Sequence, residues 1–304
     1  MDNLFRLYYI QWIRRFIEDK KFKGKWRLGK FLDSVTPELR DNVIVKTKNG
    51  FKLKISPLYD KGIEKKIFEN GIYEEGTLWC FQQIIKKGDI IFDLGANIGL
   101  TTIHASKLTG KKGRVYAFEP MPTTFNILNE NIRLNRIKNV LALNFGLSDK
   151  NKKGEIFPNL HINRGAASIY AANRIEGVEI DLKTLDSFIS NNNIDKVDFI
   201  KIDIEGAEVP MLKGANIFFS TYEKPIICIE FSKNVHTEFS PYFIYDYLNG
   251  KLNYDIFKQL KGKESLTPLI KINSKEELPK HDNLYCFQQY HYKRLPKDFF
   301  FKNS

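Results

Sequence analysis

The chain has 304 residues, and its content of apolar and aromatic residues, 42% and 13%, excludes an intrinsically disordered protein. Lysine and arginine number 48 against 36 acidic residues, so the formal net charge is +12, and half of this excess lies in the first 76 residues. The cysteines Cys80, Cys228 and Cys286 are far apart and odd in number, which excludes a disulfide framework or a zinc knuckle and favours a reducing compartment.

The first segment, Leu4–Lys21, has apolar residues at helical spacing and predicts an amphipathic helix. Packing against the protein core is the favoured interpretation of its apolar face, and an oligomer contact or a peripheral contact with a membrane surface are the alternatives. A basic run without any acid follows, for which a solvated surface is favoured over an anion-binding surface; it consists of Lys20, Lys21, Lys23, Lys25, Arg27 and Lys30. No apolar run reaches the roughly 18 residues that span a bilayer, so we expect a cytoplasmic protein, at most peripheral to the inner face of the membrane.

The segment Asn42–Ser56 alternates apolar and polar residues on both sides of Asn49-Gly50, which predicts a β-hairpin. Residues 1–75 are therefore expected to form an N-terminal extension of helix and hairpin. Residues 76–304 are expected to form the main domain.

Strands and helices alternate in the main domain. The expected strands are rich in β-branched and aromatic residues and comprise Asp89–Leu94, Arg114–Glu119, Val140–Phe145, Val197–Asp203 and Pro225–Phe231. The expected helices between them are Leu100–Leu108, Thr123–Leu134 and Ala207–Lys213, the last ending at Gly214. Such apolar strands with helices between them predict a mostly parallel sheet covered on both faces.

This alternation is interrupted at about residues 150–181, where short strands and turns predict a small β insertion that includes "GAASIY". His161 lies in this insertion and is expected to be a surface residue. A helix at Tyr242–Gly250 and two closing strands, "YDIFKQL" and "NLYCFQQ", are expected after it.

A glycine-rich turn, Gly95 to Gly99, lies between the first strand and the first helix of the main domain. A dinucleotide-binding fingerprint would require glycines at positions 97 and 100, which are Asn97 and Leu100, and no Gly-Lys-Ser/Thr follows for a phosphate-binding loop. Asp93 precedes the turn, where a carboxylate is unfavourable beside a pyrophosphate but favourable beside a cation.

Glu119 ends the second strand, 24 residues after Gly95, where a carboxylate can accept hydrogen bonds from ribose hydroxyls. A ribose, a positive charge and no phosphate together describe S-adenosylmethionine. The turn is therefore predicted to bind this cofactor.

The motifs "FDLGANIGLTT", "VYAFEPMPTTFNILNENIRLN", "TLDSFI" and "VDFIKIDIEGAEVPMLKGA" resemble those of FkbM-type methyltransferases in order and spacing, over about residues 90–230. The resemblance implies a Rossmann-like class I methyltransferase fold, α/β, with a seven-stranded, mostly parallel sheet whose last strand is antiparallel. It also implies S-adenosylmethionine as donor and methyl transfer to oxygen, on a hydroxyl of a glycan or a small metabolite.

The resemblance assigns cofactor-binding roles to Asp93, Gly95, Asn97, Gly99, Glu119 and Asp149. Asp203 ends the fourth strand, and Asp203 or Glu205 is the candidate general base, with Lys201 two residues earlier on the same face. Glu208 follows within one turn, and the alternative to a catalytic role is that its negative charge stabilises the N-terminus of the Ala207–Lys213 helix. A second, less favoured mechanism holds a divalent metal ion at Asp203 and Glu230, as in catechol-type O-methyltransferases.

Two alternatives to this function remain. The turn after the fourth strand lacks the Asp/Asn-Pro-Pro-aromatic pattern of amino-methylating nucleic-acid enzymes, which disfavours that class. The basic charge leaves an RNA ribose 2′-O-methyltransferase as an alternative, although nucleic acid is not the favoured partner. A non-catalytic module that retains the fold is disfavoured by the presence of Asp93, Glu119 and Asp203 in one chain.

Overall fold

The computed structural model describes residues 2–18, 20–36, 42–57, 59–157, 176–233 and 239–301. These residues divide into two compact units, with the boundary between Tyr73 and Glu74. Among the described residues, none of the helices combines the length and apolarity needed to cross a membrane.

The first unit is built from three helices and a hairpin. Its elements are α1 (Asp2–Glu18), α2 (Lys25–Val35), β1 (Val43–Lys46), β2 (Lys52–Ile55) and α3 (Ile63–Asn70). The hairpin is confirmed: β1 and β2 pair antiparallel from Val43–Ile55 to Lys46–Lys52, and Gly50 in the connecting turn has a φ of 80°. Val45 and Leu53 are buried on one face of the hairpin, as the alternation of apolar and polar residues predicts.

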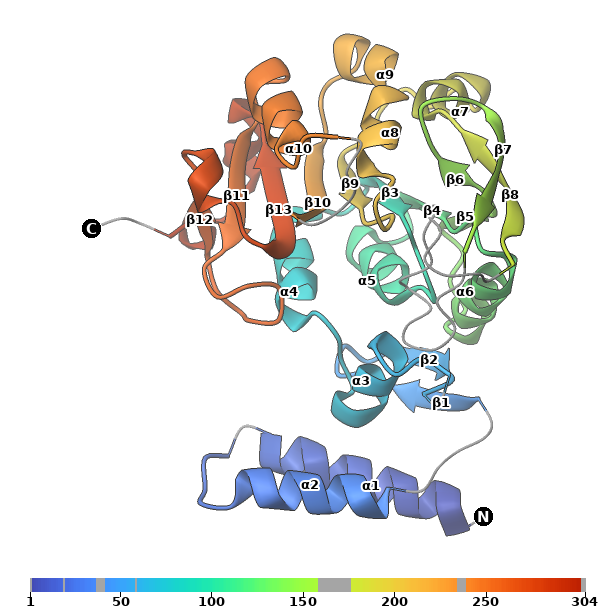
Figure 1. Cartoon of the computed structure of the whole chain (residues 1–304), viewed down its shortest axis with the longest axis vertical. Coiled ribbons are helices and arrows are strands. Elements are labelled where there is room, and N and C mark those ends of the chain that lie inside the picture. The colour runs from blue at the N-terminus through green and yellow to red at the C-terminus, as the bar shows by residue number, and fades with distance from the viewer. Residues whose placement is uncertain are drawn as a thin grey trace. The chain divides into compact units, whose positions relative to one another are not determined.

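The second unit contains a sheet of eight strands with helices on both faces (Figure 1). In spatial order the strands are β12 (Leu269–Lys271), β11 (Asp255–Gln259), β13 (His281–Phe287), β10 (Ile226–Ser232), β9 (Phe199–Ile202), β3 (Ile90–Leu94), β4 (Arg114–Phe118) and β5 (Val140–Leu143). The strands from β10 to β5 pair in parallel, and β13 lies antiparallel between β10 and β11.

This strand order confirms the Rossmann-like class I methyltransferase fold with an antiparallel last strand. The predicted number of strands, seven, is wrong, because β12 adds an eighth strand that pairs antiparallel with β11 at the edge of the sheet. This strand is only three residues long and directly follows Pro268, so it carries no alternation that a sequence pattern could detect.

Each face of the sheet is covered by its own helices. One core cluster joins side chains of β3, β4 and β9 to α7 (Leu185–Asn191), α8 (Glu208–Lys213), α9 (Asn216–Thr221), α10 (Phe243–Tyr245) and the π-helix η2 (Asp246–Lys251). The opposite face packs on α4 (Glu75–Ile84), α5 (Leu100–Thr109) and α6 (Pro122–Leu134). The side chains of Ile91 and Phe92 lie in different clusters, because successive residues of a strand point to opposite faces. Short 3₁₀ segments follow β12 and β13 at Lys275–Glu277, Gln289–Arg294 and Lys297–Phe299.

The insertion forms a separate small sheet of three strands, β6 (Gly146–Leu147), β8 (Val178–Lys183) and β7 (Lys152–Ile156). Strands β7 and β8 pair antiparallel. The segment "GAASIY" and His161 lie outside the described residues.

Gly214 ends α8 as expected, but not through a left-handed conformation, since its φ is −83°. A Cβ atom at this position would lie 2.0 Å from the carbonyl oxygen of Ser148. Glycine is required here because the chain after β6 packs directly against the end of α8.

Candidate active site

The glycine-rich turn between β3 and α5 closely approaches the end of β9. Gly95 has a φ of 79°, and a Cβ atom on it would lie 1.8 Å from the carbonyl oxygen of Asp203. Gly99 has a φ of 95°, and its Cβ would lie 2.8 Å from Leu128 on α6. The glycines therefore allow the turn to pack between α6 and the Asp203 loop, which brings the two predicted halves of the site together.

Replacement of Gly95 by alanine is expected to lower the free energy of unfolding by about 3–5 kcal/mol, because the backbone at Asp203 has to move. Gly88 is the matched control: its φ is 93°, and nothing lies within 4 Å of its Cβ position. Gly88→Ala should therefore cost only about 1 kcal/mol of conformational strain. Urea denaturation of both variants measures the difference, and equal losses would contradict the close approach at Asp203.

Glu119 follows β4 and is tied to the same turn. Its Oε2 accepts the backbone N–H of Asn97 at 2.9 Å, and its Oε1 accepts the N–H of Met121 at 3.0 Å. Burial raises the pKa of Glu119 to about 7, although the two backbone N–H groups favour its ionised form. Each carboxylate oxygen retains a lone pair for a further donor, as hydrogen bonding to a ribose would require.

Asp93 is buried at the end of β3, with only 2% of its surface exposed. Its Oδ2 accepts hydrogen bonds from the hydroxyls of Thr101 and Thr102, at 2.9 Å and 2.5 Å. Its Oδ1 and the Oδ1 of Asn97 are buried acceptors that have no hydrogen-bond donor in the described part of the chain. Buried acceptors without donors are uncommon, so the turn fits a ligand rich in donors, as the ammonium and ribose hydroxyls of S-adenosylmethionine are.

The remaining cofactor-binding candidate, Asp149, lies in the turn after β6. It is partly buried, and its Oδ1 accepts the hydroxyl of Ser148 at 3.1 Å. Its contact with adenine stays a prediction.

Lys201 and Asp203, two of the predicted catalytic residues, form an ion pair. The Nζ of Lys201 lies 3.0 Å from Oδ2 of Asp203 and 3.9 Å from Oδ1 of Asp93. Burial alone would lower the pKa of Lys201, but the two carboxylates outweigh it and raise this pKa above its usual range. Burial would likewise raise the pKa of Asp203, but Lys201 and Lys263 lower it. Asp203 is therefore a stable carboxylate and a weak proton acceptor.

Glu205, the third predicted catalytic residue, lies in surroundings that raise its pKa, whereas those of Asp203 lower its pKa. Burial, with the charges of Asp203 and Glu208, raises the pKa of Glu205 to about 8. The residue adopts a left-handed backbone with a φ of 51°. Glu208 stabilises this turn, because its Oε1 accepts the N–H groups of Ile204 and Gly206 at 3.1 Å and 3.2 Å.

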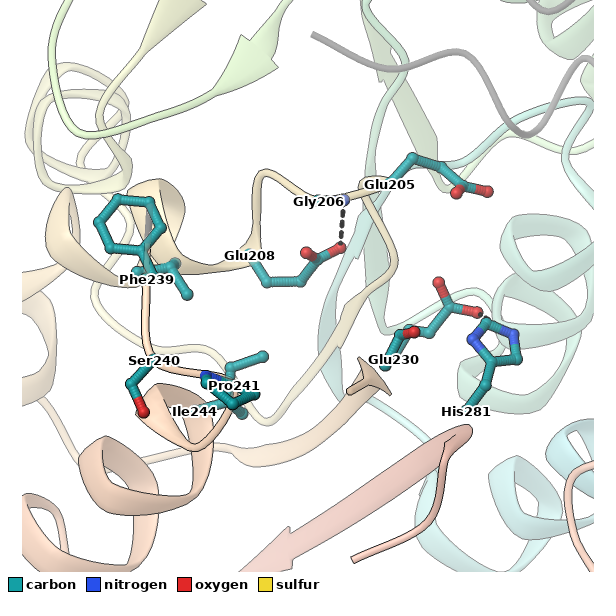
Figure 2. A pocket seen from close by; sticks show the side chains of 11 residues that line it. Glu205, Gly206, Glu208, Glu230, Phe239, Ser240, Pro241, Ile244 and His281 are labelled. Atoms are coloured by element: carbon teal, nitrogen blue, oxygen red, sulfur yellow. Dashed lines mark hydrogen bonds and ion pairs between the residues drawn. The ribbon is translucent and has the colours of Figure 1, made fainter. Parts of the chain in front are cut away.

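A pocket of about 210 Å³ opens at the ends of β9, β10 and β13. Glu205 and Glu208 line it together with Glu230 of β10 and His281 of β13, and Figure 2 shows the last two side chains directed toward each other. The Nε2 of His281 lies 3.3 Å from Oε1 of Glu230. Opposite these polar side chains lie Phe239, Ser240, Pro241 and Ile244 (Figure 2).

Lys263 completes the polar side of the site. Its Nζ lies 2.7 Å from Oε1 of Glu74 and 3.1 Å from Oε1 of Glu230. Four residues at this site were not predicted: Lys263, Glu74, His281 and Phe239. They come from segments that only the fold brings together, and none belongs to a recognisable motif.

Three carboxylates also meet the geometry of a cation site: ligand atoms of Asp203, Glu205 and Glu230 lie within 4.8 Å of one another. Oxygen donors of this kind are those that Mg²⁺ prefers. Lys201 and Lys263 already contact Asp203 and Glu230, however, and a dication would have to compete with both ammonium groups. The ion pairs therefore favour the metal-independent mechanism.

Comparisons with known proteins identify the family of the chain. Residues 93–256, more than half of the chain, match the model of the methyltransferase FkbM domain. Methyltransferase sdnD of Sordaria araneosa is 29% identical over 53% of this chain and 71% of its own length. The hexuronic acid methyltransferase AglP of Haloferax volcanii is 31% identical over 46% of this chain and 56% of its own length.

Among solved structures, M. jannaschii TYW2 in complex with AdoMet is 16% identical, with a TM-score of 0.41 and coverage of 83% of this chain and 87% of that chain. The match to the family model spans the cofactor turn, Glu119 and the Asp203–Glu208 loop. The chain belongs to the FkbM methyltransferase family, and its cofactor is S-adenosylmethionine.

Proposed function

We propose that the chain is an O-methyltransferase that methylates a hydroxyl group of a glycan or a small metabolite. The observation that carries the proposal is that Glu205, with a pKa of about 8, lines the pocket and belongs to the Asp203–Glu208 loop, which packs against the cofactor turn. A proton acceptor at this place is what an unactivated hydroxyl requires.

The proposed reaction balances with Glu205 as general base. Bound S-adenosylmethionine would supply an activated methyl group to the hydroxyl oxygen and would leave as S-adenosylhomocysteine, and Glu205 would accept the hydroxyl proton. Asp203 and Lys201 stay charged as an ion pair and fix the end of β9, so they act as positioning residues. Glu208 holds the backbone that presents Glu205.

The two sides of the pocket favour an uncharged, hydroxyl-rich acceptor. Phe239 and Ile244 offer an apolar surface to the C–H face of a sugar ring, and Glu205 and Glu230 accept hydrogen bonds from hydroxyls. Burial and the neighbouring carboxylate Asp203 raise the pKa of Glu205 to about 8 and that of Glu230 to about 9, and the same two effects oppose the entry of an acidic acceptor. The Haloferax relative is a hexuronic acid methyltransferase, so family membership leaves the acceptor's charge open and the pocket supports the neutral class.

The RNA alternative receives no support from this pocket. Three glutamates whose pKa values are raised by burial line it, and an environment that disfavours their own ionisation also disfavours a nucleic-acid backbone, which carries a negative charge on each nucleotide. The non-catalytic alternative is disfavoured because Asp93, Glu119 and Asp203 do not merely persist in the sequence but converge on one turn.

Incubation of the chain with methyl-labelled S-adenosylmethionine and fractionated cell extract tests the proposal. We expect label in neutral glycans or hydroxylated small molecules and none in RNA, with Glu205→Gln as the inactive control. Label found only in RNA would contradict the proposal. Label found only in acidic acceptors, and lost when the carboxylate groups of those acceptors are removed, would also contradict it.

A further inference from the structure

The first unit carries a group of exposed aromatic rings that the methyl-transfer site does not use. We name it the aromatic surface and define it by four residues of α1 that are each 55% to 75% exposed: Phe5, Tyr9, Trp12 and Phe16. Phe22 in the connection and Trp26 and Phe31 of α2 are further exposed aromatic residues of this unit. Large aromatic side chains seldom lie exposed together in a soluble protein without a binding partner. The sequence-based expectation that α1 packs its apolar stripe on the core is therefore wrong for Trp12 and Phe16.

The exposed rings of α1 form one continuous stripe. Phe5, Tyr9, Trp12 and Phe16 are spaced by four, three and four residues, which places them on one side of a helix. Tyr9 stacks on Trp12 with ring centroids 6.1 Å apart, and Trp12 stacks on Phe16 at 5.6 Å. Ile10, only 5% exposed, provides the inward contact of α1 from a different side of the helix. The helix therefore has an inner apolar side and an outer aromatic side.

Basic side chains accompany the rings. Lys20 Nζ lies 3.5 Å from the ring centroid of Phe16, and Lys30 Nζ lies 4.1 Å from that of Trp26. The run from Lys20 to Lys30 holds six basic residues and no acidic residue, and Lys20, Lys21, Lys23, Arg27 and Lys30 are exposed. The aromatic surface thus has a strong positive charge at the α1–α2 connection.

We propose that the aromatic surface is a docking surface for a membrane leaflet that contains anionic phospholipids. Tryptophan and tyrosine rings are stable at the boundary between headgroups and acyl chains, and lysine ammonium groups pair with lipid phosphates. A second copy of the chain fits less well, because contact between two such surfaces would bring two basic runs together. The proposal concerns the first unit alone and does not depend on the identity of the methyl acceptor.

The test is co-sedimentation of the full chain with vesicles of phosphatidylcholine alone or with about 30 mol% phosphatidylglycerol, near the anionic content of natural leaflets. We expect binding to the anionic vesicles only, with loss of binding at high salt. Lys21→Ala/Lys23→Ala should lower the partition coefficient about 25-fold, since each basic residue near such a surface contributes roughly a factor of five. Trp12→Ser/Phe16→Ser should lower it by about tenfold or more.

Matched controls come from elsewhere in the chain. Tyr59→Ser removes an aromatic side chain of the same unit that is 61% exposed, and Lys111→Ala/Lys112→Ala removes two exposed lysines of the second unit. Neither control should change vesicle binding. Every variant should keep the helix content of the wild type in circular dichroism, which verifies that the first unit is folded. Equal binding to neutral and anionic vesicles would overturn the proposal, and so would no binding to either. A third contrary result is a dimer in sedimentation velocity that Trp12→Ser/Phe16→Ser dissociates, without any vesicle binding.

Discussion

Replacement of Glu205 by glutamine is expected to lower the rate of methyl transfer by about 10²- to 10⁴-fold, the usual contribution of a general base. The substitution keeps the size of the side chain and its place in the pocket but removes the proton acceptor. Affinity for S-adenosylmethionine should stay within about tenfold, because the predicted cofactor contacts lie on the Gly95–Gly99 turn and Glu119, which a hydrogen bond joins. Single-turnover kinetics and calorimetric titration measure the two quantities separately.

The pH dependence of the same rate identifies the base. Only ionised Glu205 accepts a proton, and the pKa of Glu205 is about 8, so the rate should fall tenfold per pH unit below that value and level off above it. Asp203 has a pKa below its usual range, so a rate that is constant over about pH 6 to 9 would assign the base to Asp203 instead. Glu223→Gln, at an exposed position, is the control and should leave both rate and profile unchanged.

Replacement of Glu119 by alanine is expected to weaken binding of S-adenosylmethionine by about 100-fold or more, because two hydrogen bonds from ribose hydroxyls to a buried carboxylate are lost. The backbone N–H groups of Asn97 and Met121 also lose their acceptor. The pKa of Glu119 in the free protein is about 7, so wild-type affinity should fall as the pH drops through that value and the carboxylate becomes protonated.

Isothermal titration calorimetry of the wild type and the variant, at several pH values, measures this effect. Glu179→Gln on β8 is the matched control, since its side chain is 70% exposed. Thermal unfolding should be recorded alongside, to separate lost contacts from lost folding. Unchanged affinity in a folded Glu119→Ala variant would remove this residue from the cofactor site.

The fold could be predicted from sequence where the pattern was long and regular. Near-continuous apolar strands such as Ile90–Leu94 and helices such as Pro122–Leu134 gave clear periodicities, and strand order followed from the family resemblance. The strand β12 and the helix α9 have only three and six residues, which is too short for a periodic pattern of apolar residues to be recognised. The outward orientation of Trp12 and Phe16 could not be predicted, since a core-facing stripe and a surface-facing stripe have the same spacing.

The cofactor half of the site was more accessible to sequence reasoning than the acceptor half. Asp93, Gly95, Asn97 and Gly99 lie within seven residues, so their spacing alone limits the ligand. In contrast, Lys263 bridges Glu74 and Glu230 across more than a hundred residues of sequence, and His281 reaches the pocket from the antiparallel last strand. The different pKa values of Asp203 and Glu205 likewise depend on burial and on Lys201 and Lys263, which the motif "KIDIEGAE" does not specify.

The chemical environment of the transferred methyl group tests the account most directly. Carbon-13 NMR of the purified product, made with S-adenosylmethionine labelled at its methyl carbon, distinguishes methyl groups on oxygen, nitrogen and carbon. The site predicts a single O-methyl ether on a neutral acceptor, formed by the wild type and absent with Glu205→Gln. A methyl group on nitrogen or carbon, or an O-methyl product formed equally fast by Glu205→Gln, would contradict the proposed function.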